Sequence, residues 1–244
     1  MSRWDRSRGV PEPIRALNRV VEADNGEFLV DLRVIAPHVR IFRDQTIPFC
    51  RESVARMAEA AAVTLPEGVS LAVTDAWRPI ERQQRIYDFM LRCAREAFPS
   101  RSHASLRRTL CRWVAPTDQR APPGHCTGAA IDVHLVDAAG ELIDVTSPWD
   151  RFRAAPTYTH GLTPLAEANR TLLVEAMLGA GFSNCRDEFW HYSYGDAAWA
   201  VRTGRSECIY GLATLPQALY EAQERLAEEA MKVRENPFLP SPKA

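Results

Sequence analysis

The chain lacks a long apolar run, a leader-like start and closely spaced cysteines. No stretch approaches the roughly 18 consecutive apolar residues of a membrane helix, so we expect no membrane partner. The opening residues carry no apolar core of a signal peptide. The six cysteines form no CxxC pair. In a chain without an export signal, these features predict reduced thiols and a cytoplasmic protein.

A surplus of charge of one sign is also missing. The formal net charge is -1, so no broad basic surface is predicted and we expect no nucleic-acid partner. The chain has no internal repeat and no low-complexity tract. Its 244 residues are enough to bury one sizeable core, and the length favours one domain or two.

Helical and strand-like segments alternate irregularly along the chain. Pro79 suits the first turn of a helix, and 214–217 reads as a capping box that starts another. Mixed helices and non-alternating strands predict an α+β fold, with a small antiparallel sheet flanked by helices and an extra C-terminal helix. The predicted helices span 14–21, 51–65, 79–98, 105–114, 164–179 and 214–233, and the predicted strands span 27–35, 69–75 and 129–136.

Two segments are predicted to be loops. Residues 115–124 are rich in proline and polar residues, and this loop leads into His125. Residues 147–163 form a longer irregular segment, and loops of that length are often functional.

His125 and Asp132 lie on either side of a predicted bend at Gly128. On a strand over 129–136, Asp132 and His134 share one face, opposite the apolar residues that face the core. Asp132 therefore points into a polar pocket or into solvent, and His134 could be its neighbour. Taken alone, the pair favours the alternative of a loop histidine beside a turn-stabilising aspartate.

Glu188 and His191 are three residues apart, which places them on opposite faces of a regular strand. Both can enter one site only if the segment bulges or bends here. The alternative is an aromatic strand, with Glu188 in solvent and His191 in the core.

Arg78 lies where a strand is predicted to pass into a helix, a common place for site residues. A buried arginine there could stabilise a developing oxyanion, with Asp75 holding it in place. The alternative is a surface ion pair between these two residues, which contributes little to stability.

Together the three segments offer two imidazoles, two carboxylates and a guanidinium. A catalytic zinc needs three protein ligands and one open position, and zinc hydrolysis needs a base and a charge stabiliser as well. Cys126 adjoins a candidate ligand, but adjacent residues rarely both reach one ion, so we expect a buried thiol there.

These motifs resemble those of the zinc D-alanyl-D-alanine dipeptidases of the VanX type, within the superfamily of peptidoglycan D,D-peptidases (LAS/Hedgehog-like). That family's patterns are S-x-H-x-x-G-x-A-x-D, D-A-[YW]-R-P and E-x-W-H. The resemblance covers roughly residues 27–195. The matching residues are His125, Gly128, Ala130 and Asp132 in the first pattern, Asp75 to Pro79 in the second, and Glu188, Trp190 and His191 in the third.

The resemblance implies one Zn²⁺ on His125, Asp132 and His191, at the sheet. It implies Glu188 as general base and Arg78 as the group that polarises the scissile carbonyl. It also implies a lead-in over 1–26, a catalytic domain over 27–212 and a C-terminal helix with a polar tail over 213–244, the last without a counterpart in the short dipeptidases.

Further residues are assigned to the substrate. Asp150 falls near the acid that binds the substrate ammonium in the family, and Trp77 and Trp190 are expected to wall the pocket near Asp75. The sequence departs from the family at Pro123, which stands where the first pattern has serine, so a strict preference for D-Ala-D-Ala is not expected.

The predicted function is therefore zinc-dependent hydrolysis of D-alanyl-D-alanine or a related small D-amino-acid dipeptide. A rival is a D,D-carboxypeptidase or endopeptidase acting on larger wall peptides, and a rival of another class is a zinc-stabilised binding module. The C-terminal helix carries an apolar stripe that packs either on the core or on a second subunit of a homo-oligomer. The stripe consists of Leu215, Leu219, Ala222, Leu226 and Ala230.

Overall fold

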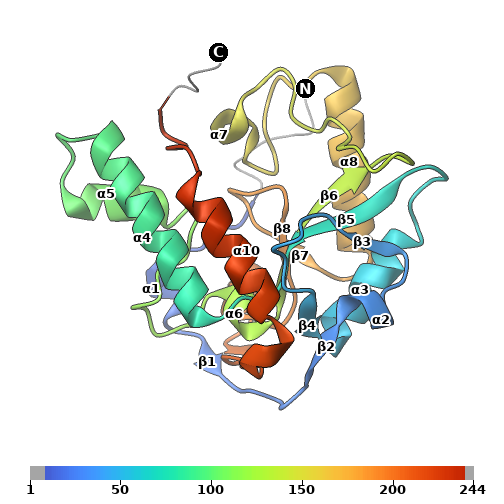
Figure 1. Ribbon diagram of the computed structural model, residues 1–244, viewed down its shortest axis with the longest axis horizontal. Helices are drawn as coiled ribbons and strands as arrows, with labels where there is room; N and C mark the ends of the chain where they lie inside the picture. Colours follow the sequence, from blue (N-terminus) through green and yellow to red (C-terminus); the bar gives the residue numbers. More distant parts are fainter. Residues whose placement is uncertain (1–8, 240–244) are drawn as a thin grey trace.

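The computed structural model describes residues 9–239, and its centre is a five-stranded sheet (Figure 1). Residues 1–8 of the expected lead-in and 240–244 of the expected tail lie outside the described residues. The strands, in spatial order, are β3 (Val39–Ile41), β5 (Ser70–Asp75), β6 (Ala130–Val136), β8 (His191–Ser193) and β7 (Ser183–Asn184).

The sheet is mixed, which corrects the prediction of an antiparallel one. β3 pairs parallel with β5, and the other pairs are antiparallel. The chain between β3 and β5 contains α3 (Glu52–Ala62), and a crossover of this length allows two strands to run the same way. The prediction of mixed helices and sheet is confirmed.

One face of the sheet forms the core. Ile131, Val133 and Leu135 of β6 are fully buried in the same cluster as residues of α3 and of α8 (Pro164–Gly179). Asp132 and His134 alternate with them and are only partly buried. The predicted strand and its division into an apolar and a polar face are therefore confirmed, and the polar face is free to carry a site.

The N-terminal part of the domain folds differently from the prediction. The expected strand over 27–35 is only β2 (Leu29–Asp31), which pairs with β4 (Phe49–Arg51). A short helix, α2 (Leu32–Ile35), follows because the Asp31 carboxylate accepts a hydrogen bond from the Arg33 amide and caps it. The other small elements are α1 (Ile14–Leu17), α9 (Ala197–Arg202) and the parallel pair β1 (Val21–Glu22) and β9 (Glu207–Cys208).

Helices α4 (Ile80–Ala97) and α5 (His103–Leu110) form a second layer with its own apolar cluster. The helix predicted from Pro79 is confirmed. α5 begins and ends earlier than predicted, because the Ser102 hydroxyl caps it by accepting from the Ser105 amide.

The C-terminal segment contradicts the predicted capping box. A 3₁₀ turn (Gln217–Leu219) precedes α10 (Glu221–Lys232), whose first residue has no side-chain cap before it. Segment 213–216 is held in another conformation, since the Ala213 amide donates to the Cys126 oxygen and the Ala213 oxygen accepts from the Trp77 indole.

α10 lies beside α4 (Figure 1), held by ion pairs from Arg82 and Arg85 to Glu224. The predicted apolar stripe does not face the core, because Leu219 is 52% and Leu226 46% exposed. The partner-subunit alternative remains a prediction. None of the helices within the described residues combines the length and the apolar character needed to cross a membrane.

Candidate active site

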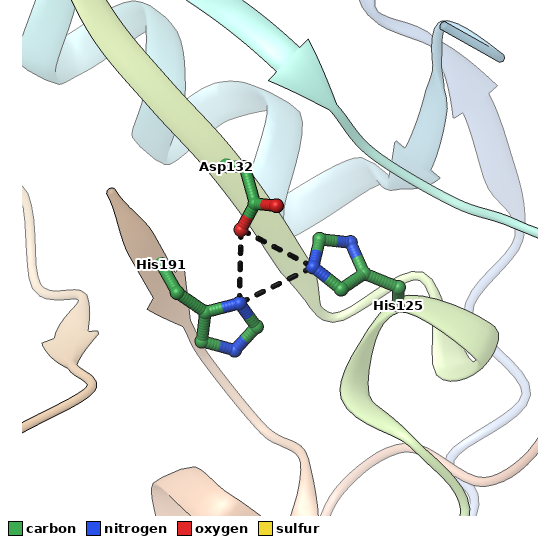
Figure 2. A group of neighbouring side chains, drawn as sticks. All are labelled: His125, Asp132 and His191. Atoms are coloured by element: carbon green, nitrogen blue, oxygen red, sulfur yellow. Dashed lines mark hydrogen bonds and ion pairs between the residues drawn. The ribbon is translucent and has the colours of Figure 1, made fainter. Parts of the chain in front are cut away.

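Three side chains from distant parts of the chain meet on the polar face of the sheet (Figure 2). His125 Nε2 lies 3.2 Å from His191 Nδ1, and each of these nitrogens lies near Asp132 Oδ1, at 3.2 and 3.0 Å. These are the three residues that the sequence predicted as metal ligands, and the structure brings them together.

Secondary structure explains this meeting. Asp132 and His191 are direct partners in the register of β6 and β8, so their side chains project from the same face. His125 comes from α6 (Gly124–Thr127), a single helical turn where a loop was expected. Gly128 ends α6 with a φ of 73°, and a Cβ there would lie 2.2 Å from the Leu29 side chain. Only glycine fits this bend between α6 and β6.

Backbone contacts fix the His125 ring. Its Nδ1 donates to the Ala76 oxygen over 2.7 Å, because a carbonyl can only accept. In the neutral ring, Nε2 is then the unprotonated nitrogen, with its lone pair directed at Asp132 and His191. A carbonyl that selects the tautomer of a histidine in this way is typical of metal sites.

The donor set fits a zinc ion. Two imidazole nitrogens and one carboxylate oxygen are ligands that zinc accepts, and zinc–nitrogen bonds of about 2.0–2.1 Å place tetrahedral ligand atoms roughly 3.3–3.4 Å apart. The three observed separations are 3.0–3.2 Å. The arrangement therefore matches three corners of a tetrahedron, with a fourth corner left for water or substrate.

The electrostatics of Asp132 also fit a ligand. Burial disfavours its charge, but the His125 and His191 rings outweigh this effect and hold the pKa of the carboxyl well below its usual range. The carboxylate is therefore ionised at neutral pH, as metal binding requires.

Glu188 reaches the site through the bend that the sequence required. The His191 amide donates to the Glu188 oxygen over 3.2 Å, which closes a turn just before β8 begins. Both residues line one cavity together with His125 and Asp132. Burial, and then the negative charge of Asp132, raise the pKa of Glu188 well above its ordinary value, although Arg78 acts in the opposite direction.

Arg78 is buried, which argues against a surface ion pair. Its Nη2 lies 2.8 Å from Asp75 and 3.9 Å from Asp132, and its Nη1 donates to the Gln83 amide oxygen. Although burial opposes the charge, the carboxylates of Asp75 and Asp132 raise the pKa of Arg78. Its Nε is buried and has no hydrogen-bond partner among the described residues, and its Nη2 is the atom that lies nearest to the cluster, at Asp132.

Cavities of about 640 and 970 Å³ adjoin these residues. Arg78, Asp132 and Glu188 line both, whereas His125 and His191 line only the smaller one. Pro123 lines the smaller cavity. The residues of the larger cavity that the sequence singled out are Asp75, His134 and Trp190.

The structure does not bring Trp77 and Asp150 into these cavities. Trp77 is 1% exposed and packs its ring edge-on against Tyr220. The exposed Asp150 caps α7 (Arg151–Ala154), a short helix inside the predicted 147–163 loop, by accepting from the Arg153 amide. The Phe152 side chain of α7 does line the larger cavity.

Sequence reasoning missed several residues around the site. Gln83 holds Arg78, and the Ala76 oxygen holds His125. Glu12 and Asp196 line the smaller cavity from segments on either side of the motifs. The spacing of Gln83 within α4 could have indicated a residue on Arg78's side, but a backbone contact such as that of Ala76 leaves no mark in the sequence.

Comparisons with known proteins identify relatives of this chain. A D-alanyl-D-alanine dipeptidase of Synechocystis sp. is 30% identical over 174 residues, which cover 62% of this chain and 70% of the relative. A D-alanyl-D-alanine dipeptidase of Escherichia coli is 24% identical over 186 residues, which cover 70% of this chain and 86% of the relative. The model of the peptidase M15 family, described as D-ala-D-ala dipeptidase, matches residues 40–208. The chain therefore belongs to the peptidase M15 family and is a peptidase enzyme.

Proposed function

We propose that this enzyme hydrolyses D-alanyl-D-alanine or a related small D-amino-acid dipeptide with one zinc ion on His125, Asp132 and His191. The observation that carries the proposal is the triangle of ligand atoms 3.0–3.2 Å apart, beside a spare carboxylate and a buried guanidinium. The names of the two relatives support the substrate class.

Zinc bound here would supply a Lewis acid and lower the pKa of a water molecule to about 7. Glu188 is the general base in this proposal. Its carboxylate accepts a proton from the attacking water and then returns the proton to the leaving amine. Its place beside His191, but outside the triangle, leaves both carboxylate oxygens available for proton transfer.

Arg78 is proposed to stabilise the carbonyl oxygen of the scissile bond as negative charge develops there. Asp75 and Gln83 hold the two terminal nitrogens of the guanidinium, and Nη2 is directed toward the cluster at Asp132. A donor fixed before the reaction needs no reorganisation when the charge forms, which is the basis of its effect on rate.

The ends of the substrate are assigned to Asp150 and Trp190. The resemblance assigns the substrate ammonium to Asp150. Asp150 lines neither cavity and caps α7 through Oδ1, so we propose that Oδ2, for which no hydrogen bond is found within the described residues, contacts the ammonium of a substrate that extends beyond the cavities. Trp190 lines the larger cavity and is proposed to wall the substrate there. We propose that the buried Trp77 supports the pocket indirectly, through the hydrogen bond that its indole donates to the Ala213 oxygen.

One observation favours a second candidate function on the same site. A dipeptide of two alanines fills only part of cavities of 640 and 970 Å³, which are each of a size that holds a drug-sized ligand. Because Arg78, Asp132 and Glu188 line both cavities, a longer peptide at these residues could extend into either one. A D,D-carboxypeptidase or endopeptidase activity on larger wall peptides is therefore the alternative.

A hydrolysis screen of the zinc-loaded protein separates these possibilities. The panel contains D-Ala-D-Ala, mixed D,D- and L,D-dipeptides, and a pentapeptide that ends in D-Ala-D-Ala. The proposal predicts release of free amino acid from the dipeptide, loss of turnover in Glu188→Gln, and full zinc content in that variant. Cleavage of the pentapeptide alone would support the second function. A protein that holds one zinc but cleaves nothing would support a binding module.

A further inference from the structure

Arg170, on α8, is fully buried although it carries a charge at neutral pH. Its Nε and Nη2 donate to the Val145 oxygen over 3.0 and 2.7 Å. Nη2 also donates to the Ala154 oxygen, and Nη1 to the Pro156 oxygen, over 3.0 and 3.1 Å. One side chain thus joins both ends of the segment 145–156, which contains α7.

This guanidinium forms no ion pair with a carboxylate in the part of the chain that the structure describes. Burial lowers the pKa of Arg170 to about 9, with Tyr192 and Asp144 acting in the opposite direction. Burial of a cation that is hydrogen-bonded to carbonyl oxygens alone, without a carboxylate partner, costs free energy. A neutral side chain could pack at this position at a lower cost in free energy. The contacts of the guanidinium therefore indicate a role other than stabilising the fold.

The same guanidinium lies against the turn that carries the proposed base. Its central carbon is 3.6 Å from the centre of the Phe189 ring. Phe189 follows Glu188 directly, and its amide donates to the Ala155 oxygen over 2.8 Å. The edge of the ring also meets the His134 ring of β6, at 5.4 Å between centres. Phe189 is therefore enclosed on several sides, and its backbone and ring are both tied to the segment that Arg170 holds.

We propose that Arg170 is a positioning residue, which clamps segment 145–156 against Phe189 and so fixes the Glu188 carboxyl relative to the His125–Asp132–His191 cluster. The inference rests on the proposed function, since it gives Glu188 the role of base. Loss of the clamp lets the turn rotate. The carboxyl then leaves its place beside the attacking water, while the three ligands, on α6, β6 and β8, stay where they are.

Arg170→Lys is the decisive variant. Lysine keeps the positive charge, but one ammonium cannot reach three separate carbonyls or lie flat on the ring. We expect kcat to fall by about 10- to 100-fold, because a misplacement of about 1 Å at the reacting groups has effects of that size. With a dipeptide held within the cavities, we expect KM to change by less than about threefold and the zinc content to stay at one per chain.

Leu173→Ala is the matched control for stability. Leu173 lies one turn further along α8 and is fully buried in the same core cluster as Val145 and Phe189, but it makes none of the hydrogen bonds of the clamp. Its truncation leaves a cavity and lowers the denaturation midpoint, yet kcat should stay within about twofold of the wild type. A stability loss alone therefore cannot imitate the expected result.

Hydrogen exchange gives a readout that does not depend on turnover. The Phe189 amide should exchange at least about tenfold faster in Arg170→Lys than in the wild type, and should be unchanged in Leu173→Ala. If the wild type cleaves no peptide, the proposed function fails but this measurement still tests the clamp. Unchanged exchange at Phe189, or a kcat in Arg170→Lys within twofold of the wild type, would overturn the inference.

Phe189→Leu tests the same link from the other side if Arg170→Lys does not fold. It removes the ring that the guanidinium covers and keeps most of the apolar volume. A similar fall in kcat at nearly constant KM supports the clamp, and unchanged kcat contradicts it. Where both single variants fold, their combination should lower kcat no further than either alone, since two residues that act through one contact are not additive.

Discussion

The Nδ1 proton of His125 is donated to the backbone oxygen of Ala76 over 2.7 Å. Ala76 directly follows β5. The end of this strand therefore determines which nitrogen of His125, 49 positions later in the chain, faces Asp132 and His191. The site is therefore organised before any ligand arrives.

Removal of the carboxylate ligand should weaken zinc binding without unfolding the protein. In Asp132→Asn the neutral amide is a poorer ligand, so we expect zinc affinity to fall by at least about 100-fold, beyond the 10- to 100-fold typical of residues that only support the ligands. Competition with a coloured chelator measures it. Asp150→Asn, outside the triangle, should keep the wild-type affinity. Equal affinity in Asp132→Asn and the wild type would exclude Asp132 as a ligand.

Replacement of Arg78 by lysine should affect the reaction more than the metal. Lysine has no counterpart of the Nη2 donor held by Asp75, and loss of one such donor typically costs 10²- to 10³-fold in kcat. We therefore expect kcat of Arg78→Lys to fall by about 100-fold at full zinc content. Arg85→Lys, which changes a half-exposed arginine of α4, is the control and should lie within about twofold of the wild type. Similar rates in both variants would argue against an oxyanion role.

The raised pKa of Glu188 predicts a pH-dependent stability in the metal-free protein. The folded state keeps a proton at pH values where the unfolded state, with a pKa near 4.5, has lost it. The contribution of the Glu188 carboxyl to the stability of the wild type is therefore lost as pH rises from 4.5 through the raised pKa. Glu188→Gln has no such contribution to lose. A tenfold difference in proton affinity between the two states corresponds to about 1.4 kcal/mol. Urea unfolding at pH 5 and pH 8 measures this effect. The free energy of unfolding of Glu188→Gln, relative to that of the wild type, should be larger at pH 8 than at pH 5. A constant difference would be inconsistent with a raised pKa.

Gly128→Ala should destabilise the protein by about 1–3 kcal/mol, because φ is 73° and the new Cβ would meet the Leu29 side chain. Gly179→Ala is the matched control. Gly179 ends α8, and nothing lies within 4 Å of a Cβ there, so this change should be neutral or stabilising by up to about 1 kcal/mol. Denaturant midpoints measure both. Equal stability of the two variants would mean that the bend before β6 tolerates a side chain.

The sequence was most informative where a pattern is local. Alternation over 129–136 predicted which face of β6 carries Asp132, and three short motifs predicted the cluster. The direction of β3 was not predictable, since a three-residue strand has no signature of its partner. The helix expected from 214 begins only at Glu221, after contacts with Trp77 and Cys126 that hold Ala213.

Residues that act through distant contacts gave no signal. Arg170 is an arginine in an ordinary helix until the fold brings the Val145, Ala154 and Pro156 oxygens around it. Nor does the spacing of Glu188 and His191 by itself distinguish a turn from a strand. Such residues are defined by tertiary structure, and a single sequence does not record it.

The most direct test of the account is X-ray absorption at the zinc edge of the zinc-loaded protein. Ligation by His125, Asp132 and His191 predicts one shell of nitrogen and oxygen scatterers at about 2.0–2.1 Å, with outer-shell scattering from two imidazoles. The adjacent Cys126 is buried, and burial raises the pKa of its thiol to about 12, so no sulfur should appear. A zinc–sulfur shell at about 2.3 Å, or a spectrum without imidazole features, would contradict the proposed metal centre.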